Sequence, residues 1–160
     1  MKWVKQSIHY WCPDTKEHKF LGQNVTVAIL DTGISPHPDF KGRILSFRDF
    51  SSTTVSSEKV LFSFSHFSPL IDNSGHGTHV AGILAGSGLL SSGTYAGIAP
   101  FCNLIIGKVL DQNGNGSIKN VINGIQWIRD IYTQFHIRII NISVGTRPDL
   151  SIHQKLLLLN

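Results

Sequence analysis

The apolar residues of the chain fall into short, nearly continuous runs that are separated by polar and glycine-rich segments. The first run, residues 25–30, reads Val-Thr-Val-Ala-Ile-Leu, and further runs cover residues 43–50, 103–110 and 137–143. Aliphatic and β-branched runs without polar alternation are typical of strands buried on both faces of a parallel sheet. We therefore predict four strands at these places, the last one buried like the first.

Two other segments have the patterns of helices. After Ser117, a good N-cap residue, apolar side chains recur at steps of three and four as far as Phe135. Residues 76–85 are mostly small and apolar, which predicts a helix buried on most sides and ending at Gly-Ser-Gly, residues 86–88. A further helical pattern begins in residues 151–159.

The alternation of strands and helices predicts an α/β fold of three layers, a mostly parallel sheet with helices on both faces. In such open sheets, ligands bind beyond the carboxyl ends of the strands. Asp31 and Gly145 both come directly after predicted strands. We therefore expect the functional site near these two residues.

Composition narrows the classes of function. The 160 residues carry a formal net charge of +4, but their lysines and arginines are scattered and form no basic stripe, which argues against nucleic-acid binding. The first residues have no signal-peptide pattern, and no apolar stretch is long enough for a membrane helix, so we expect a cytoplasmic protein. Cys12 and Cys102 lack metal-ligand spacing and are expected to be reduced, although one disulfide between them stays open.

Asp31 lies in the segment Ile-Leu-Asp-Thr-Gly. A carboxylate just past a buried strand is held rigidly and partly desolvated, so it can orient an imidazole and stabilise its cation. An aspartate in this place can also simply cap a turn. The same tripeptide, Asp-Thr-Gly, marks aspartic proteases, in which two carboxylates share a proton.

His76 lies in the segment Gly-His-Gly-Thr-His-Val-Ala-Gly, at the expected start of a helix. The helix dipole disfavours a charged imidazole there, whereas a nearby aspartate favours it, so His76 can exchange a proton near neutral pH. His79 raises the alternative of a zinc site, but the spacing is not that of His-Glu-x-x-His. We expect the ring of His79 to be buried and to anchor the helix.

These motifs resemble the subtilisin family of serine proteases, the subtilases. The resemblance covers about residues 22–150 and rests on the segments around Asp31 and His76, together with Tyr-Ala-Gly-Ile-Ala-Pro (95–100), Lys-Val-Leu (108–110) and Asn-Ile-Ser-Val-Gly (141–145). It implies a subtilisin-like fold that is incomplete at the C-terminus. Residues 1–22 would be an N-terminal extension and residues 23–160 a partial peptidase domain.

The resemblance also implies roles. His76 and Asp31 would be two members of a catalytic triad that hydrolyses polypeptides by acyl transfer through a serine. The family's substrate-binding segments would correspond to Ser143, Val144 and Gly145 and to Asn115, Gly116 and Ser117. For residues 111–117, ordinary turn chemistry is an open alternative.

The family's nucleophile lies in a Gly-Thr-Ser segment, which these 160 residues do not contain, and Asn141 is not the family's oxyanion asparagine. We therefore expect the chain alone to be inactive and its partner to be the missing C-terminal half of its own domain. A non-catalytic peptide-binding remnant and an aspartic protease remain alternatives. No cofactor is predicted: calcium accompanies many family members, but residues 86–93 contain no carboxylate.

Overall fold

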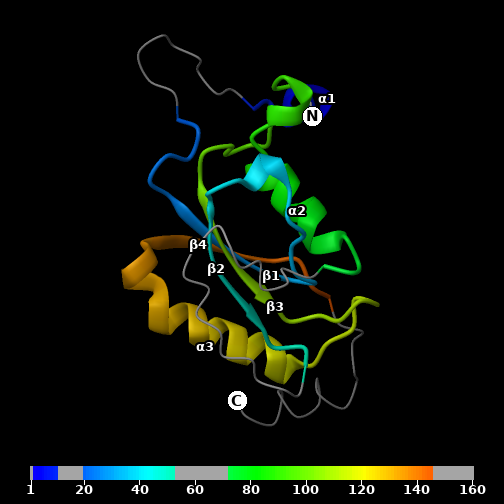
Figure 1. Ribbon diagram of the computed structural model, residues 1–160, viewed down its shortest axis with the longest axis vertical. Helices are drawn as coiled ribbons and strands as arrows, with labels where there is room; N and C mark the ends of the chain where they lie inside the picture. Colours follow the sequence, from blue (N-terminus) through cyan, green and yellow to red (C-terminus); the bar gives the residue numbers. More distant parts are fainter. Residues whose placement is uncertain (1, 11–19, 53–71, 146–160) are drawn as a thin grey trace, which may run out of the picture.

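The computed structural model describes residues 2–10, 20–52 and 72–145 (Figure 1). The elements of these residues are α1 (Lys2–Ser7), β1 (Thr26–Asp31), η1 (Pro38–Phe40), β2 (Ile44–Asp49), α2 (His76–Ala85), η2 (Leu89–Ser91), β3 (Asn103–Lys108), α3 (Ile118–Phe135) and β4 (Ile137–Ile142). The helical pattern of residues 151–159 lies outside the described residues. None of the described helices is both long and apolar enough to span a membrane.

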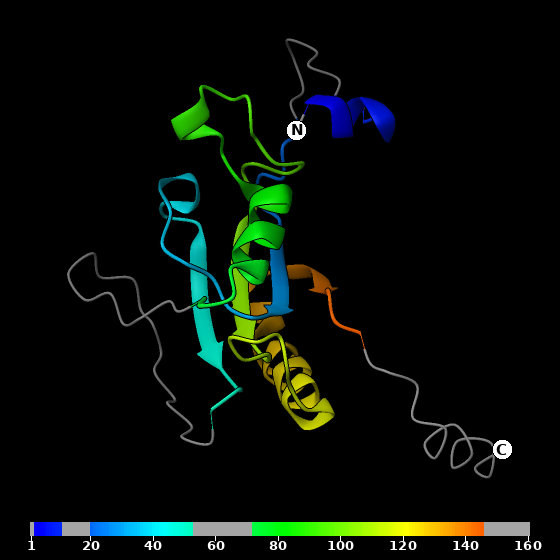
Figure 2. The same ribbon diagram turned by 90° about the vertical axis from the view of Figure 1, so that its right-hand side faces the viewer.

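The four strands form one parallel sheet in the order β2-β3-β1-β4. Helix α2 covers one face of this sheet and α3 the other (Figures 1 and 2). The predicted three-layer α/β fold is thereby confirmed, and each predicted strand boundary agrees with the observed one to within two residues.

Strand β1 shows why a strand covered on both faces needs an uninterrupted apolar sequence. All six of its residues are buried. Val27 and Ile29 pack on the α2 side of the sheet, and Ala28 and Leu30 pack on the α3 side. Because successive side chains of a strand point to opposite faces, a strand covered on both faces has no position for a solvated side chain.

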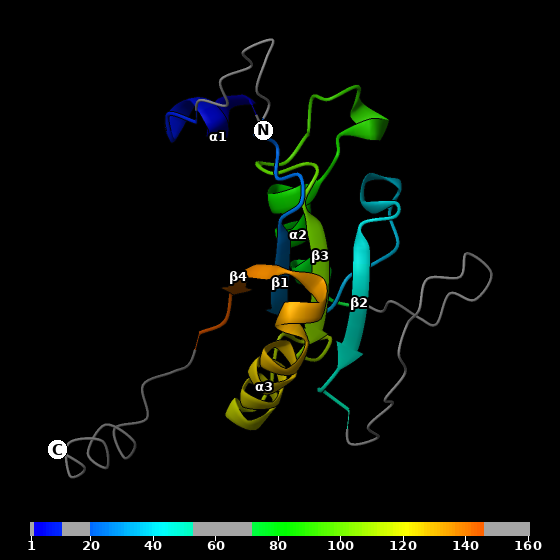
Figure 3. The same ribbon diagram turned by 90° about the vertical axis from the view of Figure 1, so that its left-hand side faces the viewer.

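Strand β4 was predicted to be buried, and this prediction is wrong for the described residues. β4 is an edge strand, visible at the margin of the sheet in Figure 3, and it pairs with β1 alone among the described strands. Its side chains Ile139, Ile140 and Ile142 are 53%, 43% and 41% exposed. The composition is that of a central strand, but the topology leaves one side of β4 uncovered by any described element.

Helix α3 begins where the sequence predicts. The side chain of Ser117 accepts a hydrogen bond from the backbone N–H of Asn120 at 3.1 Å, as an N-cap residue does. On one flank of the helix, Trp127 contacts the ring of Phe50, the residue after β2, with ring centroids 5.7 Å apart. This contact orients α3 relative to the edge of the sheet that carries β2.

Helix α2 packs on the sheet through Gly77, Ala81 and Ala85, which are buried and four residues apart. These small residues let the helix axis come close to the strands.

Two predictions about α2 are wrong. The helix is not buried on most sides, since Ile83 is 41% exposed. The side chain of His79 is exposed and not buried. His79 lies about 200° around the helix from Gly77, so it faces away from the sheet.

Candidate active site

Asp31 and His76 meet where β1 ends and α2 begins. Asp31 is the last residue of β1 and is fully buried, and His76 is the first residue of α2. The Nδ1 atom of His76 lies 2.7 Å from Oδ1 of Asp31, and the side chain of His76 is 53% exposed. The structure therefore brings together the two residues that the sequence singled out, one buried and the other open to solvent.

This contact fixes the state of the imidazole. Because a carboxylate oxygen accepts, Nδ1 carries a hydrogen, and in the neutral imidazole Nε2 then has the free lone pair. The hydrogen bond and the negative charge of Asp31 raise the pKa of His76 above its ordinary value, against a smaller lowering effect of burial. Oδ1 of Asp31 also accepts the N–H of Thr32 at 2.7 Å, whereas Oδ2 is buried with no hydrogen-bond partner among the described residues.

The start of α2 lies directly on the residues that follow β1. The N–H of Gly77 donates to Oγ1 of Thr32 at 2.9 Å. A Cβ atom at residue 77 would overlap the carbonyl oxygen of Gly33 and would come within 3.2 Å of the Asp31 Cβ. Glycine at this position is what allows the helix to come close enough for His76 to reach Asp31.

Asp72 is a buried carboxylate that the sequence reasoning missed. It is 9% exposed and accepts hydrogen bonds from Thr32, Ser74, Gly75 and Thr78. Its local sequence, Ile-Asp-Asn-Ser-Gly, looks like a turn. The signal that could have found it is a lone acidic residue four positions before the candidate histidine.

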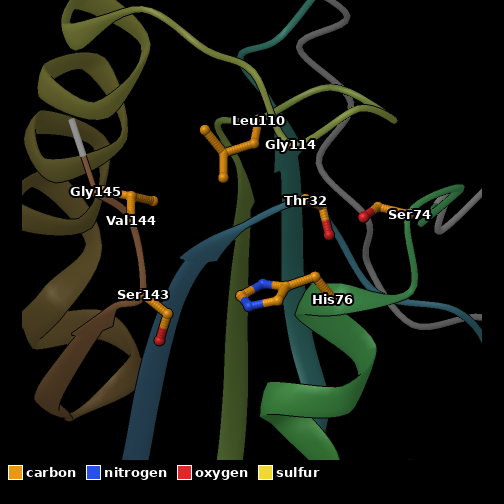
Figure 4. A pocket seen from close by; sticks show the side chains of 8 residues that line it. All are labelled: Thr32, Ser74, His76, Leu110, Gly114, Ser143, Val144 and Gly145. Carbon is orange, nitrogen blue, oxygen red and sulfur yellow. The ribbon is translucent and has the colours of Figure 1, made fainter. Parts of the chain in front are cut away.

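An open cavity of about 260 Å³ lies next to His76 (Figure 4). The predicted segment Ser143, Val144 and Gly145 lines it on one side, and Thr32 and Ser74 line it on the other. Leu110 and Gly114, which were not among the predicted site residues, also line the cavity.

The second predicted substrate segment, Asn115, Gly116 and Ser117, is not among the residues that line this cavity. Ser117 caps α3, and the N–H of Asn115 donates to the Asp111 carboxylate at 2.9 Å. Asn115 and Ser117 thus make the turn and capping contacts that the alternative of ordinary turn chemistry for residues 111–117 predicts.

The described residues contain no group of three or more His, Cys, Asp or Glu side chains that could hold a metal ion. Among the described residues, the carboxylate of Asp39 contacts the loop of residues 86–93. Asp39 accepts the N–H of Gly88 at 3.0 Å and that of Leu90 at 3.3 Å, so both its oxygens already have donors. Cys102 is buried and free, and Cys12 lies outside the described residues.

The sequence profile of a known family, described as the Subtilase family, matches residues 22–156. The chain belongs to the subtilase family. It is 44% identical over 106 residues to Serine protease AprX of Bacillus subtilis (strain 168), covering 66% of this chain and 21% of that protein. It is 37% identical over 131 residues to the Major intracellular serine protease of the same strain, covering 81% of this chain and 36% of that protein.

A solved structure supports the same assignment. The fold matches the crystal structure of a cold adapted subtilisin-like serine proteinase with a TM-score of 0.58 and 28% identity. The match covers 86% of this chain and 43% of that one. This subtilase chain thus spans less than half the length of the relatives and the structure that it matches here. Among the described residues, Asp31 is hydrogen-bonded to an imidazole and not to a second carboxylate, which argues against the aspartic-protease alternative.

Proposed function

We propose that this chain supplies the Asp31–His76 part of a serine endopeptidase site, whose nucleophile comes from a part of the fold outside these 160 residues. The observation that carries the proposal is the 2.7 Å contact between a fully buried carboxylate and a half-exposed imidazole. Membership of the subtilase family supports serine-protease chemistry. The chain contains no Gly-Thr-Ser segment, so we expect it to be inactive alone.

In the proposed reaction, Nε2 of His76 takes the proton of the serine hydroxyl as the serine attacks the peptide carbonyl. His76 then returns this proton to the leaving amine. Asp31 keeps Nδ1 protonated and stabilises the imidazolium that forms between these steps. Water hydrolyses the acyl-enzyme in a second round that uses the same base.

The proposed substrate is a polypeptide in an extended conformation. Residues 143–145 continue from the edge strand β4 and line the cavity beside His76, where an extended peptide can hydrogen-bond to backbone groups. Ser143 is oriented from its own strand, since its Oγ accepts a hydrogen bond from Nδ2 of Asn141 at 2.9 Å.

An uncovered apolar surface supports the proposal of a protein partner. On α3, Trp127 faces the β2 edge, and a second apolar stripe lies on the opposite flank, toward β4. On β4, Ile140 and Ile142 pair with Ala28 and Leu30, whose side chains face α3. We call these exposed side chains of α3 and β4 the α3–β4 surface: Ile118, Ile122, Ile125, Tyr132, Ile140 and Ile142.

The proposed occupant of the α3–β4 surface is the C-terminal half of a subtilase domain. Such a partner would add a strand beside β4, whose outer edge pairs with no described strand, and would cover the exposed isoleucines. The solved relative is more than twice as long as the part that this chain matches, so it has enough further chain for this role.

Two measurements test the proposal. The purified chain, incubated with a peptide substrate and with a serine-directed phosphonate, is expected to show neither hydrolysis nor labelling. The nucleotide sequence beyond the codon for Asn160 is expected to encode Gly-Thr-Ser in a joined or separate frame, and a protein that includes this segment is expected to show both activities. Labelling of the 160-residue chain itself would contradict the proposal. Peptide binding by the longer protein without cleavage would instead support the non-catalytic alternative.

A further inference from the structure

We propose that Asp72 is a positioning residue, which holds the first turn of α2, and with it the imidazole of His76, against Asp31. Asp72 lies four residues before His76 and is almost fully buried. The inference rests on the proposed role of His76 as the base, but its test needs no peptide hydrolysis.

Asp72 acts first as a distant cap for α2. The N-cap residue, Gly75, has a left-handed conformation with a φ of 84° and no side chain to accept the free N–H groups of the first turn. The Asp72 carboxylate accepts these hydrogen bonds in place of an N-cap side chain. Oδ1 accepts the N–H of Ser74 at 3.2 Å and that of Gly75 at 2.9 Å, and Oδ2 accepts the N–H of Thr78 at 2.8 Å.

The same carboxylate is also tied to the end of β1. Thr32, the residue next to Asp31, donates its hydroxyl to Oδ1 of Asp72 at 2.8 Å, and its Oγ1 accepts the N–H of Gly77, next to His76. Thr78 donates its hydroxyl to Oδ2 at 2.5 Å and accepts the N–H of Ser35 at 2.9 Å. Thr32 and Thr78 thus connect the Asp72 carboxylate to the residues that follow Asp31 and to the first turn of α2, which begins with His76.

All five hydrogen bonds to the Asp72 carboxylate come from donors on four residues, so the site favours the ionised form. Burial by itself would raise the pKa of Asp72, but the hydrogen bonds from Thr78, Thr32 and Gly75 outweigh it and lower the pKa. The negative charge in turn contributes to the raised pKa of His76, after the larger effect of Asp31. The third charged group near this point, Lys108, directs its Nζ to the carbonyl oxygens of Thr32 and Leu110.

The test is an NMR titration of His76 in the 160-residue chain, with urea unfolding to show that each variant is folded. In Asp72→Asn the charge is lost and the amide group faces the N–H of Thr78, so we expect a clear downward shift of the His76 pKa. Asp49→Asn is the matched control. Asp49 also accepts two hydrogen bonds of 2.7 Å, both from Ser51, but it is not among the groups that shift the pKa of His76.

A second variant keeps the inference testable if Asp72→Asn does not fold. Thr78→Val retains the Asp72 charge but removes the hydroxyl that bonds to Asp72 and to Ser35, so the His76–Asp31 contact should loosen and the His76 pKa should again fall, by less. A purely structural cap would lower the free energy of unfolding in both variants and would leave the His76 pKa unchanged in Thr78→Val, because in Asp72→Asn the lost charge alone already lowers that pKa. Folded variants with an unchanged pKa, or an equal shift in Asp49→Asn, would overturn the proposal.

Discussion

Gly77 and Gly33 are in such close contact that the carbonyl oxygen of Gly33 occupies the place of a side chain on residue 77. This contact joins the first turn of α2 to the residues that follow Asp31. Replacement of Gly77 by alanine must therefore move the helix away from β1. We expect Gly77→Ala to lower the free energy of unfolding by about 1–3 kcal/mol, the usual cost of overpacking. It should also lower the pKa of His76, because the contact with Asp31 lengthens.

Gly82 offers a matched control in the same helix. A Cβ atom there would meet nothing within 4 Å. Gly82→Ala should raise the free energy of unfolding by about 0.5–1 kcal/mol, because alanine is the better helix former, and should leave the pKa of His76 unchanged. Urea unfolding and an NMR titration of both variants check the prediction. Equal effects of the two substitutions would show that the contact with Gly33 does not position the helix.

The Asp31–His76 contact should also make stability depend on pH. The pKa of His76 is raised in the folded chain, whereas in the unfolded chain it is close to about 6.5. The contact therefore contributes its full stability below about pH 6.5 and loses it as the pH rises through the folded-state pKa. The half-exposed imidazole is screened by solvent, so the contribution is small.

The measurement is the free energy of unfolding against pH for the chain and for His76→Gln. The difference between the two curves should shrink as the pH rises across this window. Curves that stay parallel from pH 6 to 9 would show that His76 does not bind its proton more tightly in the folded chain than in the unfolded chain, and would contradict the prediction.

Much of the fold could be predicted because its strands have a strong local signal. A strand covered on both faces has an uninterrupted apolar sequence, and β1 and β3 have such sequences. For β4 the same reasoning predicted the strand but not its place, because sheet order depends on contacts between distant segments. The exposure of His79 was missed although its signal is local, since the repeat of Gly77, Ala81 and Ala85 already marks the buried face of α2.

The candidate active site could likewise be predicted only where its residues lie in local motifs. Asp31 and His76 are found because each lies in a motif and next to a secondary-structure boundary. Asp72 was missed because its partners come from three segments, the end of β1, the loop before α2 and the first turn of α2. A lone acidic residue four positions before His76 is a local signal for Asp72 itself, but it does not report these distant partners.

Lys108 connects two loops at the carboxyl ends of the strands. It is 7% exposed, and its Nζ donates to the carbonyl oxygens of Thr32 and Leu110, both cavity-lining residues. Lys108→Met removes both bonds and leaves two carbonyl groups without this donor, so we expect a loss of about 1–3 kcal/mol in unfolding free energy. The exposed Lys119 provides the control. Lys119→Met should change stability by no more than about 0.5 kcal/mol, and an equal loss would contradict the role of Lys108.

The α3–β4 surface should make the isolated chain self-associate. An edge strand with apolar side chains pairs readily with another chain, and Ile142 on this edge is 41% exposed. A lysine at residue 142 places a charge in any such interface, so Ile142→Lys should weaken association about tenfold or more, or about 1.4 kcal/mol. Ile83 on α2 is also 41% exposed but lies away from this surface, so Ile83→Lys should leave association unchanged. Sedimentation velocity over a range of concentrations measures association in both variants. Weaker association in Ile142→Lys alone would show a specific interface at β4. An equal change in both variants would show only a general gain in solubility and would contradict the prediction.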